Sequence, residues 1–335
     1  MAWILPAVNL GTSLWHRRPS PRSFLLLSLH RALVALGLIF AGIWLTSCGG
    51  TQIGAPFPDG SSGQSVDYTI QLRFVDDRLT PDEQALFRQV ADRWATVIVG
   101  DLPDVLLTLL PGSCLSTSPG VNQLIDDLLV DISVSTVDGE GGLLGQAGPC
   151  LVRTGSNLPL YGSVQLDLDD RTGLAASNQL DEVFSHELGH VLGFGTTWAD
   201  QGLVTQVFSP DPRFIGNLAI QEFSRLGGLG TVPIENRGGQ GTRIDHWRES
   251  TFDNELMTGT INPRTENPLS RLTVASLSDL GYGVDLDAAD AYALSSPKQS
   301  FQKGKSGLTP AWEKGLDQPI RVVDLQGTYL YTLSE

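Results

Sequence analysis

The pentapeptide His186-Glu187-Leu188-Gly189-His190 has the residue types and the spacing of a catalytic metal site. Residues four positions apart lie on the same face of a helix, so His186 and His190 can direct both imidazoles at one ion. Glu187 lies beside them and can reach a metal-bound water without being a ligand. Imidazole nitrogen suits Zn²⁺, which keeps a fourth position open for water in catalytic sites. The spacing therefore predicts one catalytic zinc ion with Glu187 as general base.

Histidine and methionine are scarce in the chain, which contains five His and two Met in 335 residues. In many metzincin proteases a third histidine ligand follows three residues after a glycine. Here Gly193 is present, but Thr196 stands at the ligand position. The next histidine is His246, 56 positions after His190, and Met257 follows it by eleven residues. His246 is therefore the candidate third ligand.

This long insertion before the third histidine resembles the leishmanolysin family of zinc endopeptidases, and the resemblance covers about residues 67 to 290. It implies that Met257 forms a tight turn beneath the metal. It also implies an α+β, metzincin-type zincin fold: a twisted mixed sheet with two helices above the cleft and an irregular, partly helical C-terminal lower half. Further stretches that carry the resemblance are Val232-Pro233-Ile234-Glu235-Asn236, the run 238–242, Asp245-His246-Trp247-Arg248-Glu249, Asn254-Glu255-Leu256-Met257-Thr258-Gly259 and the segment from Leu272 to Tyr282.

The first 47 residues read as a signal peptide, with four arginines, no acidic residue and a 15-residue apolar run from Ala32 to Thr46. The run ends in Leu45-Thr46-Ser47-Cys48-Gly49, which resembles the bacterial lipobox, in which the cysteine is acylated. We therefore expect a lipoprotein exported and anchored to a bacterial membrane through Cys48. The alternative is a plain signal anchor with an incidental Cys48.

Composition limits the partners of the mature chain. Removing the arginines of the signal segment leaves 18 basic and 37 acidic residues, a net charge of −19, which argues against nucleic acid as a partner. Calcium is possible in so acidic a chain, but no calcium-loop motif supports it. The remaining cysteines, Cys114 and Cys150, are expected to pair in an oxidising compartment, the alternative being two buried free thiols.

The elements that must position this site can be read from hydrophobic patterning. A capping box with Pro81 at its first helical position opens a helix that carries Leu86, Val90, Trp94 and Val97. The metal helix is expected from an apolar stripe of Leu180, Phe184, Leu188 and Val191, and it should end in a left-handed cap at Gly193. The expected strands are 67–75, 128–137, 162–168 and 141–149, the last with an unpaired edge bordering the cleft, and a late helix is expected over 273–280.

We therefore expect a signal peptide (1–47), a flexible tether (48–66), a metallopeptidase domain (67–295) and a C-terminal tail (296–335), in which all four lysines lie and 320–333 has strand character. The predicted activity is hydrolysis of peptide bonds in protein or peptide substrates. Asp245, Glu249 and Glu255 are candidates for orienting the ligands. The alternatives are a zincin-fold lipoprotein that binds without cutting and a zinc hydrolase of a non-peptide bond. Oligomeric state is not predicted.

Overall fold

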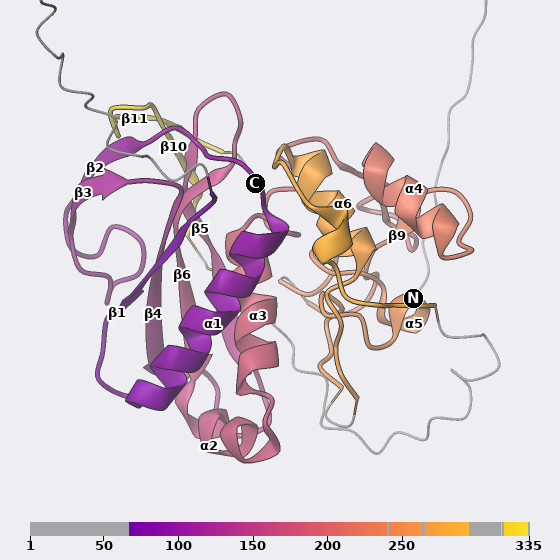
Figure 1. Ribbon diagram of the computed structural model, residues 1–335, viewed down its shortest axis with the longest axis horizontal. Coiled ribbons are helices and arrows are strands. Elements are labelled where there is room, and N and C mark those ends of the chain that lie inside the picture. Colours follow the sequence, from indigo (N-terminus) through magenta and orange to yellow (C-terminus); the bar gives the residue numbers. More distant parts are fainter. Residues whose placement is uncertain (1–66, 240, 263–264, 295–315, 317, 334–335) are drawn as a thin grey trace, which may run out of the picture. The chain divides into compact units, whose positions relative to one another are not determined.

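A computed structural model describes residues 67–239, 241–262, 265–294, 316 and 318–333 (Figure 1). These residues belong to one compact unit, Ser61–Glu335. The expected signal segment, Cys48, the tether and the four lysines lie outside the described residues. Within the described part of the chain, the helices are too short or too polar to cross a membrane.

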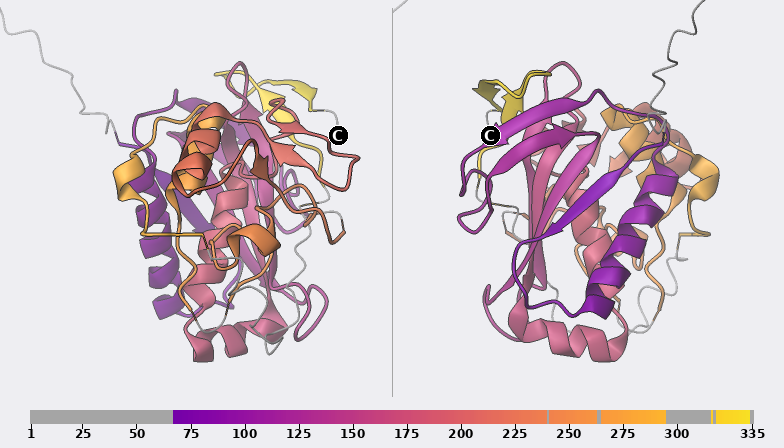
Figure 2. Two further views of the ribbon diagram at one scale, coloured as in Figure 1. Left: turned by 90° about the vertical axis from the view of Figure 1, so that its right-hand side faces the viewer. Right: turned by 60° about the vertical axis from the view of Figure 1, so that its left-hand side comes forward.

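A six-stranded mixed sheet forms the larger half of the unit (Figures 1 and 2). Strands β1, β4 and β6 run parallel to one another, and β5 runs antiparallel to β6. The central strand β4 is apolar along most of its length and is buried on both faces. This is expected for a strand in a sheet that is covered on both faces. In sheet order the strands are β1 (Ile70–Phe74), β4 (Leu128–Ser135), β6 (Pro159–Asp167), β5 (Gly145–Arg153), β10 (Arg321–Val323) and β11 (Tyr329–Thr332).

Two helices, α1 (Pro81–Val97) and α3 (Leu180–Val191), cover one face of this sheet (Figure 2). The expected capping box is present, because Thr80 Oγ1 accepts a hydrogen bond from Glu83 N and the Glu83 carboxylate accepts one from Thr80 N at 2.7 Å. The helices pack through Phe87 and Phe184, whose rings stack with centroids 4.1 Å apart. A further helix, α2 (Leu168–Ser177), follows β6 at the end of the sheet. The predicted two-helix layer is confirmed.

The chain after α3 forms a less regular half that carries the third histidine. Aromatic rings form its core in place of a large sheet: Phe194, Trp198 and Trp247 lie within 5.1 Å of one another by ring centroids. The late helix begins at Arg271, directly after its N-cap Ser270 and two residues earlier than the sequence predicts. The elements are β7 (Val204–Thr205), β8 (Arg213–Phe214), α4 (Asn217–Arg225), β9 (Val232–Pro233), α5 (Glu249–Phe252), α6 (Arg271–Leu280) and the 3₁₀ turn η1 (Leu286–Ala288).

A separate antiparallel ribbon, β2 (Val105–Leu109) with β3 (Val121–Ile125), lies beside the sheet. The loop between them contains Cys114, which forms a disulfide with Cys150 of β5 across 36 residues of sequence. Both cysteines are buried in a second apolar cluster together with residues of β2 and β6. The expected disulfide is confirmed, and it ties the ribbon to the strand that borders the metal helix.

The strand at the expected edge, residues 141–149, extends further along the chain than the sequence predicts, and beyond Pro149 it pairs with a further strand. The strand is β5 and runs from Gly145 to Arg153, and its second part is not an edge, because Leu151–Arg153 pairs in parallel with β10 of the C-terminal segment. Leu316, which precedes β10 in the sequence, lies beside Gly148: a Cβ added to the glycine would be 3.9 Å from Leu316 Cδ1. Residues 320–333 thus fold back onto the sheet as the hairpin β10–β11.

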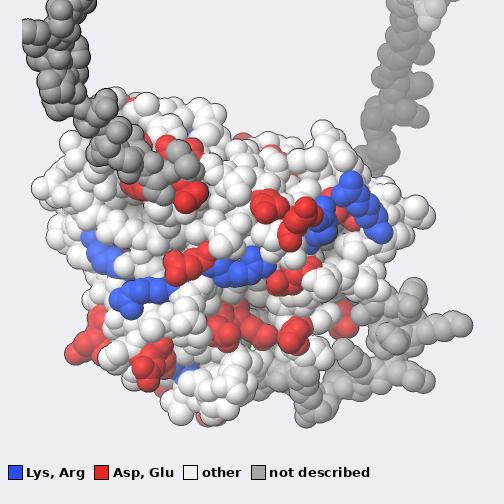
Figure 3. Space-filling model, viewed as in Figure 1, with Lys and Arg blue, Asp and Glu red and all other residues white. Residues whose placement is uncertain are grey.

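The surface carries both signs of charge, and on the face drawn in Figure 3 the basic side chains lie among acidic ones. Several arginines are paired, among them Arg93 with Asp290 at 3.0 Å and Arg271 with Asp287 at 2.7 Å. Such exposed pairs contribute at most about 1 kcal/mol each. The fold is therefore stabilised mainly by the apolar side chains buried in its two halves rather than by these ion pairs.

Candidate metal centre

Three imidazoles meet at the boundary between the two halves of the unit. His186 and His190 come from one face of α3, and His246 comes from the segment between β9 and α5. Their Nε2 atoms are 3.0 Å (186 to 190), 3.1 Å (186 to 246) and 3.0 Å (190 to 246) apart. All three residues are buried, with exposed fractions of 4% or less. The structure thus brings together the three histidines that the sequence singles out.

A backbone carbonyl fixes the orientation of each ring. His186 Nδ1 lies 2.6 Å from Leu256 O, His190 Nδ1 lies 2.9 Å from Phe194 O, and His246 Nδ1 lies 3.0 Å from Thr242 O. A carbonyl oxygen only accepts, so each Nδ1 must donate its hydrogen, and in a neutral ring Nε2 then carries the lone pair. The carboxylates of Asp245, Glu249 and Glu255 do not occupy these positions.

This donor set fits a metal ion. Three lone pairs that face one another at 3.0–3.1 Å cannot be hydrogen-bonded to each other, but they can share one cation. In tetrahedral zinc sites with Zn–N bonds of about 2.0–2.1 Å, ligand nitrogens lie about 3.3 Å apart. The observed separations match that arrangement closely, and neutral imidazole is a ligand that zinc prefers.

Glu187 lies on the same helix, fully buried beside two of the histidines. Its carboxylate faces Gly145 at the start of β5: a Cβ built on that glycine would lie 2.6 Å from Glu187 Oε1. Only a residue without a side chain leaves the carboxylate in this position. The glycine therefore explains how a carboxylate and the first residues of the bordering strand share the space next to the metal ligands.

Met257 lies directly against the metal helix. A Cβ built on Gly189 would lie 2.7 Å from Met257 Sδ and 2.8 Å from its Cε. The glycine within the His-Glu-x-x-His motif thus lets the methionine approach the helix backbone. The side chain belongs to the turn Glu255–Thr258, closed by a hydrogen bond from Thr258 N to Glu255 O at 3.1 Å. We call this segment the methionine turn.

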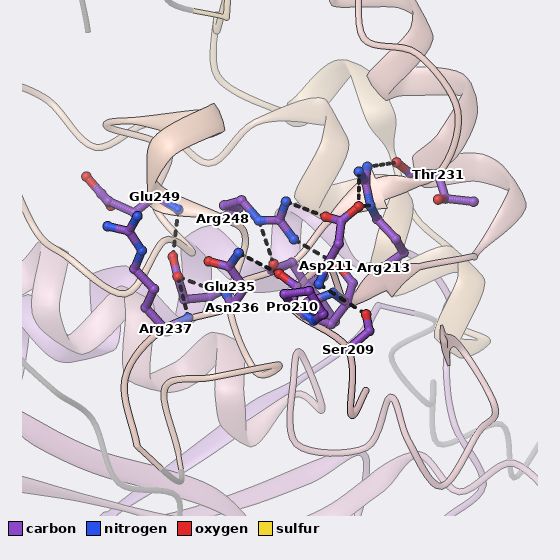
Figure 4. Close-up of polar contacts among 12 residues, drawn as sticks. Ser209, Pro210, Asp211, Arg213, Thr231, Glu235, Asn236, Arg237, Arg248 and Glu249 are labelled. Carbon is purple, nitrogen blue, oxygen red and sulfur yellow. Dashed lines mark hydrogen bonds and ion pairs between the residues drawn. The ribbon is translucent and has the colours of Figure 1, made fainter. Parts of the chain in front are cut away.

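The segment that carries His246 is held by a polar network around Glu235 and Arg248 (Figure 4). Glu235 N donates to His246 O at 2.8 Å, and the Glu235 carboxylate accepts from the backbone N of Asn236, Arg237 and Glu249, each at 2.9 Å. The Arg248 guanidinium binds Asp211 at 2.6 Å and also donates to the Ile234 and Pro212 carbonyls.

Sequence reasoning did not find these supporting groups. Glu235 stands in the quoted Val-Pro-Ile-Glu-Asn stretch, which marked the resemblance without giving the residue a role. The three carbonyls that orient the imidazoles belong to the backbone, so residue type carries no signal for them. The short form of a third-ligand motif points to Thr196, and the structure uses that residue differently: its hydroxyl donates to His190 O at 2.8 Å.

A mixed sheet, a helix carrying His-Glu-x-x-His and a third histidine from a later segment above a methionine turn define a zincin-type metal centre. The chain belongs to the leishmanolysin (peptidase M8) family, whose model matches residues 114–296. The match includes all three histidines, Glu187 and Met257, and it ends before the C-terminal hairpin β10–β11.

Individual relatives are similar over a short stretch. Leishmanolysin-like peptidases of Caenorhabditis elegans and Caenorhabditis briggsae are each 50% identical over 50 residues, and that of Drosophila melanogaster is 42% identical over 50 residues. Each alignment covers 15% of this chain and 7% of the relative. The family and the disulfide together indicate an exported protein, since disulfides persist in oxidising compartments.

Proposed function

We propose that the protein is an exported, zinc-dependent endopeptidase that hydrolyses peptide bonds of protein substrates. The observation that carries the proposal is the buried set of three converging Nε2 atoms with Glu187 beside it on α3. Membership of a peptidase family supports the same reaction. Zinc bound by these histidines would supply Lewis-acid activation of water and of the peptide carbonyl.

The remaining chemistry belongs to the chain's own residues. Glu187 accepts the proton of the attacking water and passes it to the leaving nitrogen, acting first as general base and then as general acid. The three carbonyls hold the imidazoles in the tautomer that turns Nε2 inward, so the ligands need no rearrangement on binding. Met257 packs beneath them against the Gly189 backbone.

Two substitutions test this proposal on purified residues 49–335. Glu187→Ala should retain one zinc ion per chain and lose cleavage of casein, whereas His246→Ala should lose both zinc and cleavage. Glu140→Ala is the matched control, because it removes an exposed carboxylate outside the site. A wild-type protein without stoichiometric zinc contradicts the proposal. Zinc binding without turnover would indicate a binding protein, and turnover of esters or glycans but not of peptides would indicate a different hydrolase.

We also propose that residues 1–47 are removed on export, that Cys48 is acylated as the anchor to a bacterial membrane and that 48–66 tether a catalytic domain spanning 67–295, followed by the tail 296–335. The lipobox-like ending of the apolar run supports this. A single acyl chain binds membranes only marginally, so anchoring needs more than one. Cys48→Ser should release the processed protein into the soluble fraction. Retention of the variant in the membrane would favour a plain signal anchor.

A further inference from the structure

Glu255 is a buried carboxylate that is neither a metal ligand nor close to the reacting atoms. It is 0% exposed and begins the methionine turn. A buried charge is costly unless donors surround it. The groups that donate hydrogen bonds to the Glu255 carboxylate therefore indicate its role.

Four donors converge on this carboxylate. Oε2 accepts from Met257 N at 2.7 Å, and Oε1 accepts from Ser270 N at 3.2 Å, from Ser270 Oγ at 2.6 Å and from Thr273 Oγ1. Burial raises the pKa of Glu255, and these hydrogen bonds oppose that rise. Ser270 is the N-cap of α6. One carboxylate thus joins the methionine turn to the first turn of α6.

The methionine turn and the first turn of α6 are each connected to a metal ligand by hydrogen bonds. The residue between Glu255 and Met257 is Leu256, whose carbonyl oxygen is 2.6 Å from His186 Nδ1. On the other side, Thr273 Oγ1 also accepts a hydrogen bond from Trp247 Nε1 at 2.8 Å, and Trp247 N donates to Met257 O at 3.0 Å. Trp247 directly follows the ligand His246. The carboxylate therefore acts on His186 through one carbonyl and on His246 through one indole.

We propose that Glu255 is a positioning residue for the metal centre, with Thr273 as its relay to the His246 segment. Its carboxylate fixes the carbonyl that orients His186 and the hydroxyl that holds Trp247, so that ligands from the two halves of the unit converge on one point. The inference rests on the metal site proposed above. It predicts that the Glu255 network sets metal affinity and ligand geometry, beyond its contribution to stability.

Isosteric variants separate this role from a merely structural one. Glu255→Gln places an amide N–H₂ against either Met257 N or the Ser270 and Thr273 donors. An amide nitrogen cannot accept a hydrogen bond, so in either orientation the hydrogen bonds to one of the two segments are lost. Thr273→Val removes the hydroxyl and keeps the shape, and Thr273→Ser restores the hydroxyl. Ser276→Ala is the control: Ser276 is equally buried in α6, but its hydroxyl donates to the Thr273 carbonyl, away from the carboxylate.

The measurements are zinc affinity by chelator competition, the visible absorption spectrum of the Co²⁺-loaded protein and thermal unfolding of the metal-free protein. Glu255→Gln and Thr273→Val should bind zinc about 10- to 100-fold more weakly, the range found for outer-shell partners of metal ligands. Both should shift the Co²⁺ bands, whereas Thr273→Ser and Ser276→Ala should match wild type. Thr273→Val keeps the test decisive should Glu255→Gln fail to fold.

Unchanged affinity and Co²⁺ spectrum in a folded Glu255→Gln or Thr273→Val protein would overturn the inference. So would an equal loss of affinity in Ser276→Ala, since that would mean that any buried change in α6 disturbs the site. If wild type itself binds neither Zn²⁺ nor Co²⁺, the proposed metal site fails and the inference falls with it. The wild-type titration therefore separates the two failures.

Discussion

At the scale of single residues, the chemistry of the site depends on positions without side chains as much as on the titratable groups. Gly145 leaves the space that the Glu187 carboxylate occupies, and Gly189 leaves the space that Met257 occupies. Glycine is required at both positions because a segment distant in sequence packs closely against the backbone there. Residue types alone identified Glu187 and the histidines, because their spacing has a chemical reason. The need for glycine at 145 became visible only once β5 was placed against α3.

Gly145→Ala should impair catalysis while leaving zinc in place. Its Cβ would lie 2.6 Å from Glu187 Oε1, so the Glu187 carboxylate, the proposed general base, must move. A displacement of about 1 Å can lower the rate about 100-fold. The measurement is kcat on a fluorogenic peptide together with zinc content. Gly148→Ala is the matched control on the same strand, where the nearest atom to an added Cβ is 3.8 Å away. Equal rates for both variants would show that Glu187 tolerates the shift.

We expect Glu249 to make the stability of the protein depend on pH. Burial, together with the nearby carboxylates of Asp253 and Glu235, raises the pKa of Glu249 from 4.5 to about 7. Between those pH values the folded protein binds more protons than the unfolded chain, so stability falls as pH rises from about 4.5 to 7. The loss should be about 2–3 kcal/mol.

Glu249→Gln should remove this dependence and make the protein more stable than wild type at neutral pH. Chemical unfolding at several pH values measures both effects. Glu140→Gln, at an exposed position, should leave the wild-type slope intact. A stability of Glu249→Gln that still declines in parallel with wild type would show that other groups carry the pH dependence.

At the scale of elements, the regular half of the unit was predictable and the irregular half was not. α1 and α3 follow from apolar spacing and caps, and β4 follows from a largely apolar stretch. By contrast, β7, β8 and β9 have two residues each, too short for any periodicity to show. They exist because the aromatic core and the Glu235 network hold the chain in place.

The C-terminal hairpin shows the same limit. Its strand character is visible in the sequence, but its partner is not, because a three-residue strand carries no information about register. The pairing of β10 with β5 depends on long-range packing: Val322 and Val323 are 0% and 2% exposed. Sequence reasoning therefore treated 320–333 as an addition, although its strand β10 pairs with β5, the strand that contains the expected edge.

Val322→Ala should lower the free energy of unfolding of the whole unit by about 2 kcal/mol, because two buried methyl groups are lost from the main sheet. Leu330→Ala on β11 is the control, since that side chain is 45% exposed and should cost much less. Urea unfolding followed by tryptophan fluorescence measures both. Separate transitions for the hairpin and the sheet, or no change in Val322→Ala, would mean that the tail does not fold with the catalytic unit.

At the scale of the whole molecule, two cross-links reach across the chain: the disulfide and the metal ligands. The disulfide closes a loop of 36 residues, for which chain entropy in the unfolded state predicts about 3–4 kcal/mol of stabilisation. The double variant Cys114→Ala, Cys150→Ala should lose that amount in chemical unfolding under oxidising conditions. Wild type in reducing buffer should approach the variant, and a variant as stable as oxidised wild type would contradict the prediction.

The metal is the second cross-link, and its removal should loosen the junction between the two halves. Two ligands belong to α3 and the third lies 56 residues later in the aromatic half, so the bound ion adds a cross-link between segments that otherwise meet through packing and hydrogen bonds. An ion that binds only the folded state stabilises it by about 4 kcal/mol at a thousandfold excess over its dissociation constant. Without the ion, three neutral Nε2 lone pairs would face one another.

Treatment with a chelator should therefore abolish cleavage and lower the midpoint of thermal unfolding, and added Zn²⁺ should restore both. His246→Ala is the informative comparison, because it leaves two ligands on α3 and removes the one that spans the halves. Its unfolding midpoint should be insensitive to the chelator. Activity lost without any change in the wild-type midpoint would indicate that the ion serves the reaction alone and that packing is sufficient to hold the halves together.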